Sequence, residues 1–373
     1  MTVPFPAHTD TLFRNRNRKM RRQTAKHGAS PPSRTAAYGD RNDSDKTAKL
    51  ESRLVKYEEL PEYLKDNEFI RDYYRCEWPL KDLVLSVFQL HNETLNVWTH
   101  LVGFMIFLGL ILMSLTEKMT LENVIASLFR EGSDGWLKTK LMSQSNGSNA
   151  FFSDSYLRHI PITPILAAIK DPNPIPLWPW FVFLGGAMCC LIFSSISHLF
   201  ACHSPRFHYF FWRLDYTGIS LMIVSSFFPP IYYSFLDHTF WLVLYLSSIT
   251  LLGILIVATL LAPSLSDGRC RPFRAGLFLC MGFSGVIPST HAVILHWGHS
   301  QILVSLGYEM AMGALYGIGA AIYVTRIPER WKPGAFDVVG HSHQIFHVFV
   351  VLAALAHCAA SLVIMEWRRG LAV

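Results

Sequence analysis

Long apolar runs separated by short polar connections dominate the chain. Because a helix that crosses a bilayer needs roughly 17 to 25 mainly apolar residues, the pattern predicts seven transmembrane helices. The expected spans are 95–115, 178–199, 211–228, 240–262, 275–295, 302–324 and 342–365. The fifth pattern is the weakest, since Pro288 interrupts it among small and polar residues, which favours a kinked or pore-facing helix. The predicted fold class is therefore all-α, a seven-transmembrane helix bundle.

The composition agrees with a multi-pass membrane protein. Hydrophobic residues make up 51% of the 373 residues and charged residues 16%, which is typical of an integral protein of the plasma membrane or an endomembrane. The net charge of +6 comes mostly from the N-terminal residues, and no nucleic-acid partner is expected. The pattern thus divides the chain into a membrane domain, 95–366, with its flanking segments.

The segments before the first span are polar or amphipathic. Residues 1–56 are basic and lack the apolar core of a signal peptide, so we expect a disordered cytosolic tail. Its basic cluster at 14–22 fits anionic lipid binding, a nuclear signal, or a solvated tail that reinforces topology. In 57–94, an amphipathic segment, apolar residues recur at helical spacing behind Pro79, which predicts a short interfacial helix. These residues are Leu80, Leu83, Val84, Val87 and Phe88.

Basic residues in the short connections predict the orientation. Arginines and lysines follow spans two, four and six, whereas the connections after spans three and five carry none. Because basic loops stay in the cytosol, the N-terminus is expected there, and the tail 367–373 outside or in a lumen, although Arg368 and Arg369 argue weakly against this. The predicted orientation is the reverse of that of a G-protein-coupled receptor.

The connection 116–176 is the one long external loop in this topology. It contains the glycosylation sequon Asn146-Gly147-Ser148, which would lie on the side where glycans are added. The sequons at Asn42 and Asn92 would face the cytosol and stay unmodified. The seven cysteines show no metal-binding spacing, and no disulfide framework is implied.

Four polar side chains fall at one predicted depth near the cytosolic ends of three spans. His198 ends the second span, Asp215 lies early in the third, and His343 and His347 share one face of the seventh. Three imidazoles suit zinc and leave a fourth position for water. Asp215 could then hold that water or act as a general base, and Ser194, one turn before His198, could orient it.

Simpler explanations exist for each of these residues. A lone intramembrane histidine is commonly a hydrogen-bonded core residue, Asp215 could pair with Arg213 or cap a helix, and Ser194 could bond back to its own helix. The remaining histidines, among them His91, His100 and His357, are expected to be structural or interfacial. Only the coincidence of three histidines and one acid at one level points to a metal.

Several spaced motifs resemble one known family. LPEYLKDNEFIRDYYR, SVFQLHNETLNVWTHLVGF, SSISHLF, LDYTGI and SHQIFHVFVVLAALAH are similar, in order, to signatures of the progestin and adiponectin receptor (haemolysin III-like) family, with HNETLNVWTH nearest to plant heptahelical transmembrane proteins. The resemblance runs from about residue 60 to 357. It implies the same reversed topology and a zinc ion held by His198, His343 and His347, with Asp215 linked through water and Ser194 beside it.

The resemblance leaves the activity open between three hypotheses. The first is a zinc-containing receptor in hormone, sugar or stress responses, with an unknown extracellular ligand and an unknown cytosolic signalling protein. The second, implied by the related alkaline ceramidases, is a zinc-dependent hydrolase of a ceramide-like membrane lipid. The third is a scaffold in which zinc only links three helices. The long loop 116–176 departs from adiponectin receptors, so their ligand is not carried over.

Overall fold

The computed structural model describes residues 53–115, 175–262 and 268–371. Within these ranges seven helices are long and apolar enough to cross a membrane, which confirms the predicted fold class. No β-strand occurs in the described residues, where Val55 and Tyr74 form only an isolated antiparallel bridge. The tail before residue 53 and nearly all of the loop 116–176, including Asn146, lie outside the described residues, and the cytosolic orientation stays a prediction.

The spans are mostly longer than the apolar pattern predicts. They comprise α2 (Thr94–Leu115), α6 (Trp178–Phe200), α7 (Pro205–Ser226) with α8 (Phe228–Phe235), α9 (Thr239–Leu260), α10 (Arg271–Phe283) with α11 (Val286–Leu295), α12 (Ser300–Thr325) and α13 (Ser342–Leu371). The third span begins six residues before the expected 211, since Pro205 at the first turn and the Ser204 cap start the helix in polar sequence. The last helix continues past 365 to Leu371, and Arg368 in this polar end forms an ion pair with Asp237.

Prolines explain both interruptions within spans. Pro229 and Pro230 have no N–H group to donate to the carbonyls four residues earlier, and α7 accordingly ends at Ser226 before α8 begins. In the fifth span, Pro288 cannot donate to Ser284, and the break between α10 and α11 falls at that residue. The predicted kink is therefore confirmed, whereas the continuation of the third span to Phe235 was not foreseen.

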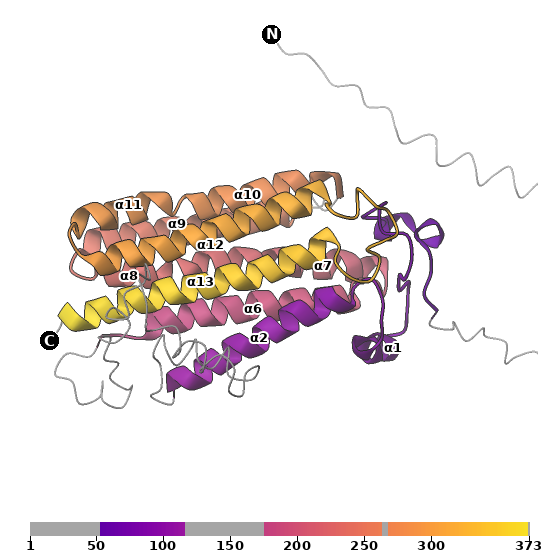
Figure 1. The fold of residues 1–373 in the computed structure, drawn as a ribbon, viewed down its shortest axis with the longest axis horizontal. Helices are drawn as coiled ribbons and strands as arrows, with labels where there is room; N and C mark the ends of the chain where they lie inside the picture. Colours follow the sequence, from indigo (N-terminus) through magenta and orange to yellow (C-terminus); the bar gives the residue numbers. More distant parts are fainter. Residues whose placement is uncertain (1–52, 116–174, 263–267, 372–373) are drawn as a thin grey trace, which may run out of the picture. The chain divides into compact units, whose positions relative to one another are not determined.

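Helix α13 is the most buried span. Of its most apolar stretch 67% is buried, against 17% for the corresponding stretches of α9, α10–α11 and α12. It lies beside α12 over much of its length and also contacts α2 and α8 (Figure 1). The main apolar core joins α13 to α2 and α6 through fully buried side chains such as Phe107, Leu184 and Leu362. His347 on α13 thus lies inside the protein.

Close packing of α6 on α7 depends on small residues. A side chain at Gly186 would meet Ser225 Oγ at 1.9 Å, and one at Gly218 would meet Cys190 Cα at 3.0 Å. Such positions let two helix backbones approach where no water-driven hydrophobic force acts. The contact sets the position of two polar residues on these helices, His198 and Asp215.

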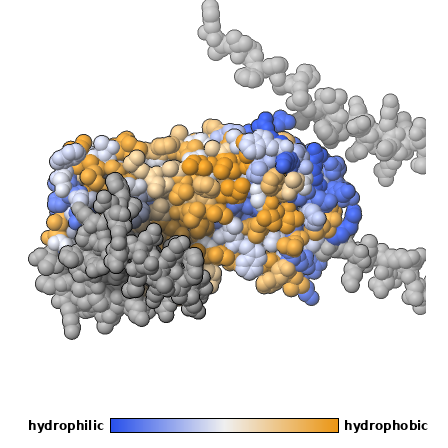
Figure 2. Space-filling model, in the orientation of Figure 1, coloured by the Kyte–Doolittle hydropathy of each residue, from blue (hydrophilic) through white to orange (hydrophobic). Residues whose placement is uncertain are grey.

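Apolar and polar surfaces separate along the bundle. Figure 2 shows a broad hydrophobic belt over the middle of the visible face and hydrophilic residues gathered over one end. That end holds the N-terminal segment 53–93, with η1 (Tyr57–Glu59), η2 (Glu62–Leu64), α1 (Leu80–Leu85) and η3 (Ser86–Phe88). Helix α1 buries Leu83 but exposes Val84 and Leu85, and Phe88 after it is 83% exposed. A helix that exposes apolar side chains at the polar end of the bundle agrees with the predicted interfacial helix.

The N-terminal segment is held against the connection between α12 and α13. Arg71 N donates to Asp337 Oδ1 at 2.9 Å, Asn67 Nδ2 donates to Glu329 Oε1 at 3.1 Å, and Arg326 forms an ion pair with Glu68. Glu329 also accepts from Ser342 N at 2.7 Å at the start of α13. These contacts cover the end of the bundle where α13 begins.

Candidate metal centre

Three predicted residues meet at this covered end. The rings of His198, His343 and His347 are each 4.8 Å from the other two, measured between centroids. One ring nitrogen from each lies within 4.8 Å of the others, and this is the one such histidine, cysteine or carboxylate group found among the described residues. His198 and His347 are buried and His343 is half-buried. The structure thus brings together residues 149 positions apart.

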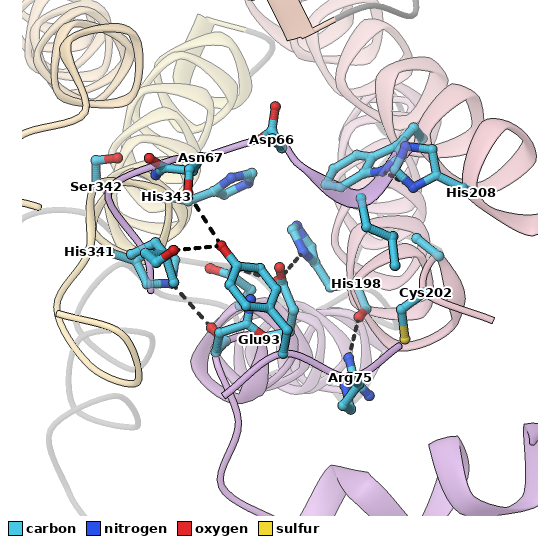
Figure 3. A pocket seen from close by; sticks show the side chains of 17 residues that line it. Asp66, Asn67, Arg75, Glu93, His198, Cys202, His208, His341, Ser342 and His343 are labelled. Carbon is cyan, nitrogen blue, oxygen red and sulfur yellow. Dashed lines mark hydrogen bonds and ion pairs between the residues drawn. The ribbon is translucent and has the colours of Figure 1, made fainter. Parts of the chain in front are cut away.

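Hydrogen bonds orient two of the imidazoles. His198 Nδ1 lies 2.8 Å from Glu93 Oε2, which leaves the buried Nε2 without a hydrogen-bond partner (Figure 3). His347 Nδ1 lies 3.1 Å from the Asn96 carbonyl and 3.2 Å from Thr99 Oγ1. Metal-binding histidines usually have one nitrogen held by such a carboxylate or carbonyl partner while the other binds the ion. The donor set therefore fits a zinc site.

The three rings would have to move inward to hold an ion. In tetrahedral coordination, zinc–nitrogen bonds of about 2.0–2.1 Å place two ligand nitrogens about 3.4 Å apart. The ligand atoms here lie up to 4.8 Å apart, so the largest separation must shorten by about 1.4 Å. His198, His343 and His347 would hold the ion, and zinc would supply Lewis-acid polarisation of a bound water or carbonyl group.

The geometry rejects the simpler explanations for Asp215 and Ser194. Asp215 is buried in the middle of α7, where Ser204 provides the cap, and within the described residues it forms no ion pair with Arg213. Ser195 Oγ donates back to Leu191 O at 3.0 Å, but the buried Ser194 Oγ makes no such bond. Both Asp215 and Ser194 instead line the same cavity as His343 and His347.

The histidines separate two cavities. A small cavity of about 90 Å³ lies toward the N-terminal segment and is lined by polar groups that include Glu93, His198 and His343 (Figure 3). A larger one of about 720 Å³ extends into the bundle between α7, α10, α12 and α13, and its walls are mainly apolar. His343 lines both. The site is therefore placed between a polar space and a space suited to a hydrocarbon chain.

Several residues around the site were not singled out from the sequence. Glu93 lies in the sequon at Asn92 and in the family motif HNETLNVWTH, but the sequence predicted no separate role for it. Burial alone would raise the pKa of its carboxyl, but His198 and Asn96 outweigh burial and hold that pKa well below its usual range. Arg75 donates to the His198 carbonyl at 2.8 Å, and His100 stacks on His347 with centroids 3.7 Å apart. The one available signal was the cluster of polar residues just before and inside the first span.

Comparison with known proteins identifies relatives along almost the whole chain. Residues 88–358 match the Haemolysin-III related family. Heptahelical transmembrane protein 3 of Arabidopsis thaliana is 53% identical over 350 residues, covering 94% of this chain and 98% of that protein. Heptahelical transmembrane protein ADIPOR1 of Oryza sativa subsp. japonica is 47% identical over 327 residues, covering 85% and 86%.

A more distant relative carries a receptor name. The adiponectin receptor protein of Drosophila melanogaster is 35% identical over 307 residues, which cover 82% of this chain and 58% of that protein. The seven helices, the ordered motifs and these similarities agree. The chain therefore belongs to the Haemolysin-III related family, as a multi-pass membrane protein whose relatives are named heptahelical transmembrane proteins and adiponectin receptors.

Proposed function

We propose that this protein is a zinc-binding seven-helix receptor that transmits a signal across the membrane in hormone, sugar or stress responses. The observation that supports it most is the triangle of His198, His343 and His347 inside the bundle. Hydrogen bonds from Nδ1 to Glu93 and to the Asn96 carbonyl orient the His198 and His347 rings. Relatives named as receptors support the receptor role. The natural ligand would act from outside, and a cytosolic protein would receive the signal.

Zinc would link the ends of α6 and α13 and so couple any movement of these helices. Helix α6 ends at the site and α13 begins there, and α13 also packs along α12. A ligand that separates or closes the ring triangle would change the exposed end of the bundle, where segment 53–93 and the α12–α13 connection meet. That end is the surface on which a cytosolic partner would bind.

Metal content tests this proposal directly. Purified wild-type protein should contain about one zinc ion per chain, and the double variant His343→Ala, His347→Ala should lose it, because one histidine cannot hold the ion alone. His291→Gln is the matched control, since His291 bonds Tyr245 on another pair of helices and should keep full zinc. Full occupancy in the double variant would refute the ligand assignment.

A second candidate function is hydrolysis of a lipid amide of the ceramide type. It is favoured by Asp215 and Ser194, which line the apolar cavity beside the histidines. Among the described residues, the buried Ser194 Oγ has no hydrogen bond that would explain it. The cavity would hold the hydrocarbon chains, and the small polar cavity on the other side of His343 would admit water. Asp215 would accept the proton from that water, and Ser194 would orient it or donate to the substrate oxygen.

The variant Asp215→Asn distinguishes the enzyme from a receptor or a scaffold. In an enzyme it should retain zinc but lose lipid hydrolysis by about two to four orders of magnitude, the usual effect of removing a general base. Asp237→Asn, at the other end of the bundle, is the control and should keep wild-type turnover. If zinc-loaded wild-type protein releases no fatty acid from a range of ceramides, the hydrolase is rejected and the receptor or a structural zinc site remains.

A further inference from the structure

A second polar cluster lies deep between α12 and α13. His357 Nδ1 is 2.9 Å from Glu309 Oε1 and 3.1 Å from Oε2, and His357 Nε2 is 3.2 Å from Ser361 Oγ. The His357 side chain is 3% exposed and Glu309 17%. A carboxylate within a membrane span is energetically expensive and by default marks function. The histidine site does not use this cluster.

The cluster is distinct from the histidine site but shares its cavity. His357 follows His347 by ten residues on α13, which corresponds to about 15 Å along a helix. Glu309 and His357 both line the cavity of about 720 Å³ that also contains Asp215, His343 and His347. One apolar cavity thus has polar groups at two separate depths.

The pair links α12 to α13, but a neutral side chain makes such a link one turn away, where Ser305 Oγ donates to the Ala360 carbonyl at 3.1 Å. Helix packing alone therefore does not require a carboxylate at this depth. The order Glu309, His357, Ser361 is that of a hydrolase triad, but Ser361 is fully buried and does not line the cavity, so no substrate can reach its hydroxyl. A role for the pair toward the cavity remains.

Glu309 has more acceptor positions than His357 can fill. A carboxylate offers about four acceptor positions on its two oxygens, and the one proton of His357 Nδ1, which lies near both oxygens, leaves most of them unfilled. The Glu309 side chain is 17% exposed and lines the cavity, so a ligand that brings a hydrogen-bond donor gains affinity there. Because a neutral group is much cheaper to transfer into apolar surroundings than an ammonium ion, a hydroxyl group fits best.

We propose that Glu309 and His357 form a second binding subsite, which accepts a hydrogen bond from a mid-chain hydroxyl of an amphipathic lipid. The polar end of that lipid lies at the histidine site, and its chain extends along the cavity for about 15 Å to Glu309. The subsite selects among lipids by the position of a hydroxyl on the chain. It rests on the proposed function only in that lipids enter this cavity.

The test uses two uncharged amides that differ by this hydroxyl alone. The ethanolamides of oleic acid and ricinoleic acid are titrated into zinc-loaded full-length protein in nanodiscs, and binding is followed by tryptophan fluorescence, for which Trp212 lines the cavity. The wild type should bind the ricinoleic amide about tenfold more tightly, the effect expected for one hydrogen bond to a charged group.

Variants of Glu309 then identify the acceptor. Glu309→Met, similar in size, should bind both amides equally, with zinc content and oleic amide affinity within about twofold of wild type. Glu309→Gln, which keeps a polar contact with His357, should show a reduced preference if the methionine variant does not fold. Ser305→Ala, one turn earlier on α12 and lining the same cavity, is the control and should keep the full preference.

Each result bears on a different part of the proposal. Equal affinity of the wild type for the two amides, or an undiminished preference in Glu309→Met, would overturn the subsite while leaving the zinc site and lipid binding intact. Failure of both amides to bind the wild type would refute lipid entry into the cavity, and with it both the subsite and the hydrolase. Zinc content, measured on the same samples, separates these outcomes from a loss of the histidine site.

Discussion

Glu93 should control how tightly the proposed site of His198, His343 and His347 binds zinc, although Glu93 is not among the proposed ligands. Its Oε2 atom lies 2.8 Å from His198 Nδ1 and also accepts from Asn96 Nδ2 at 2.6 Å. This bond fixes the His198 ring with Nε2 directed away from Glu93, and the carboxylate raises the basicity of the imidazole. Removing such a partner lowers metal affinity about 10- to 100-fold, which corresponds to about 1.4–2.8 kcal/mol.

Two substitutions of Glu93 separate charge from orientation. Glu93→Gln keeps an oxygen that can accept from His198 and removes the charge, so we expect about a tenfold loss of zinc affinity. Glu93→Leu leaves the His198 and Asn96 donors buried without an acceptor. The zinc affinity should therefore fall about 100-fold, and the free energy of unfolding should decrease by about 1–3 kcal/mol.

Competition with a fluorescent zinc chelator measures these affinities on purified protein, with thermal unfolding recorded in parallel. Glu77→Gln is the matched control, because Glu77 lies in the same segment but bonds the exposed Tyr63 hydroxyl. Wild-type zinc affinity in a folded Glu93→Leu protein would refute the reasoning, since the His198 ring would then be oriented by other contacts.

Three further predictions concern topology, pH and packing. In sealed vesicles an N-terminal tag should resist external protease while Asn146 carries a glycan, as the basic loops predict; a digested tag would mean the reverse orientation. Burial lowers the pKa of His91 to about 3 from 6.5, so the unfolded chain binds an extra proton between these values, and stability should fall with decreasing pH below about 6.5. The free energy of unfolding should change by up to about 1.4 kcal/mol per pH unit, and His91→Asn should reduce this pH dependence in thermal unfolding. An unchanged pH dependence in the variant would mean that other groups cause it. Gly186→Ala should destabilise the protein by about 1–3 kcal/mol, since its Cβ would meet Ser225 Oγ at 1.9 Å, whereas Gly185→Ala, with nothing within 4 Å, should be neutral.

The sequence by itself determined the fold class and the approximate spans, because a bilayer requires long apolar helices whatever their neighbours are. It also predicted which histidines meet. His343 and His347 share a helix face by spacing, and the alternating direction of successive spans brings His198 to the same level. Helix ends were less predictable: α13 continues to Leu371 through residues whose polarity suggested a tail.

Only the tertiary structure decided the surroundings of these residues. Glu93 and His198 are 105 positions apart, and Glu309 pairs with His357 across two helices. Neither pair has a local sequence pattern, since such contacts depend on the rotation of each helix about its axis and on close approaches such as that at Gly186. The same rotation directs Ser194 and Asp215 into the cavity and Ser361 away from it, although all three occur on helical faces that the sequence alone cannot orient.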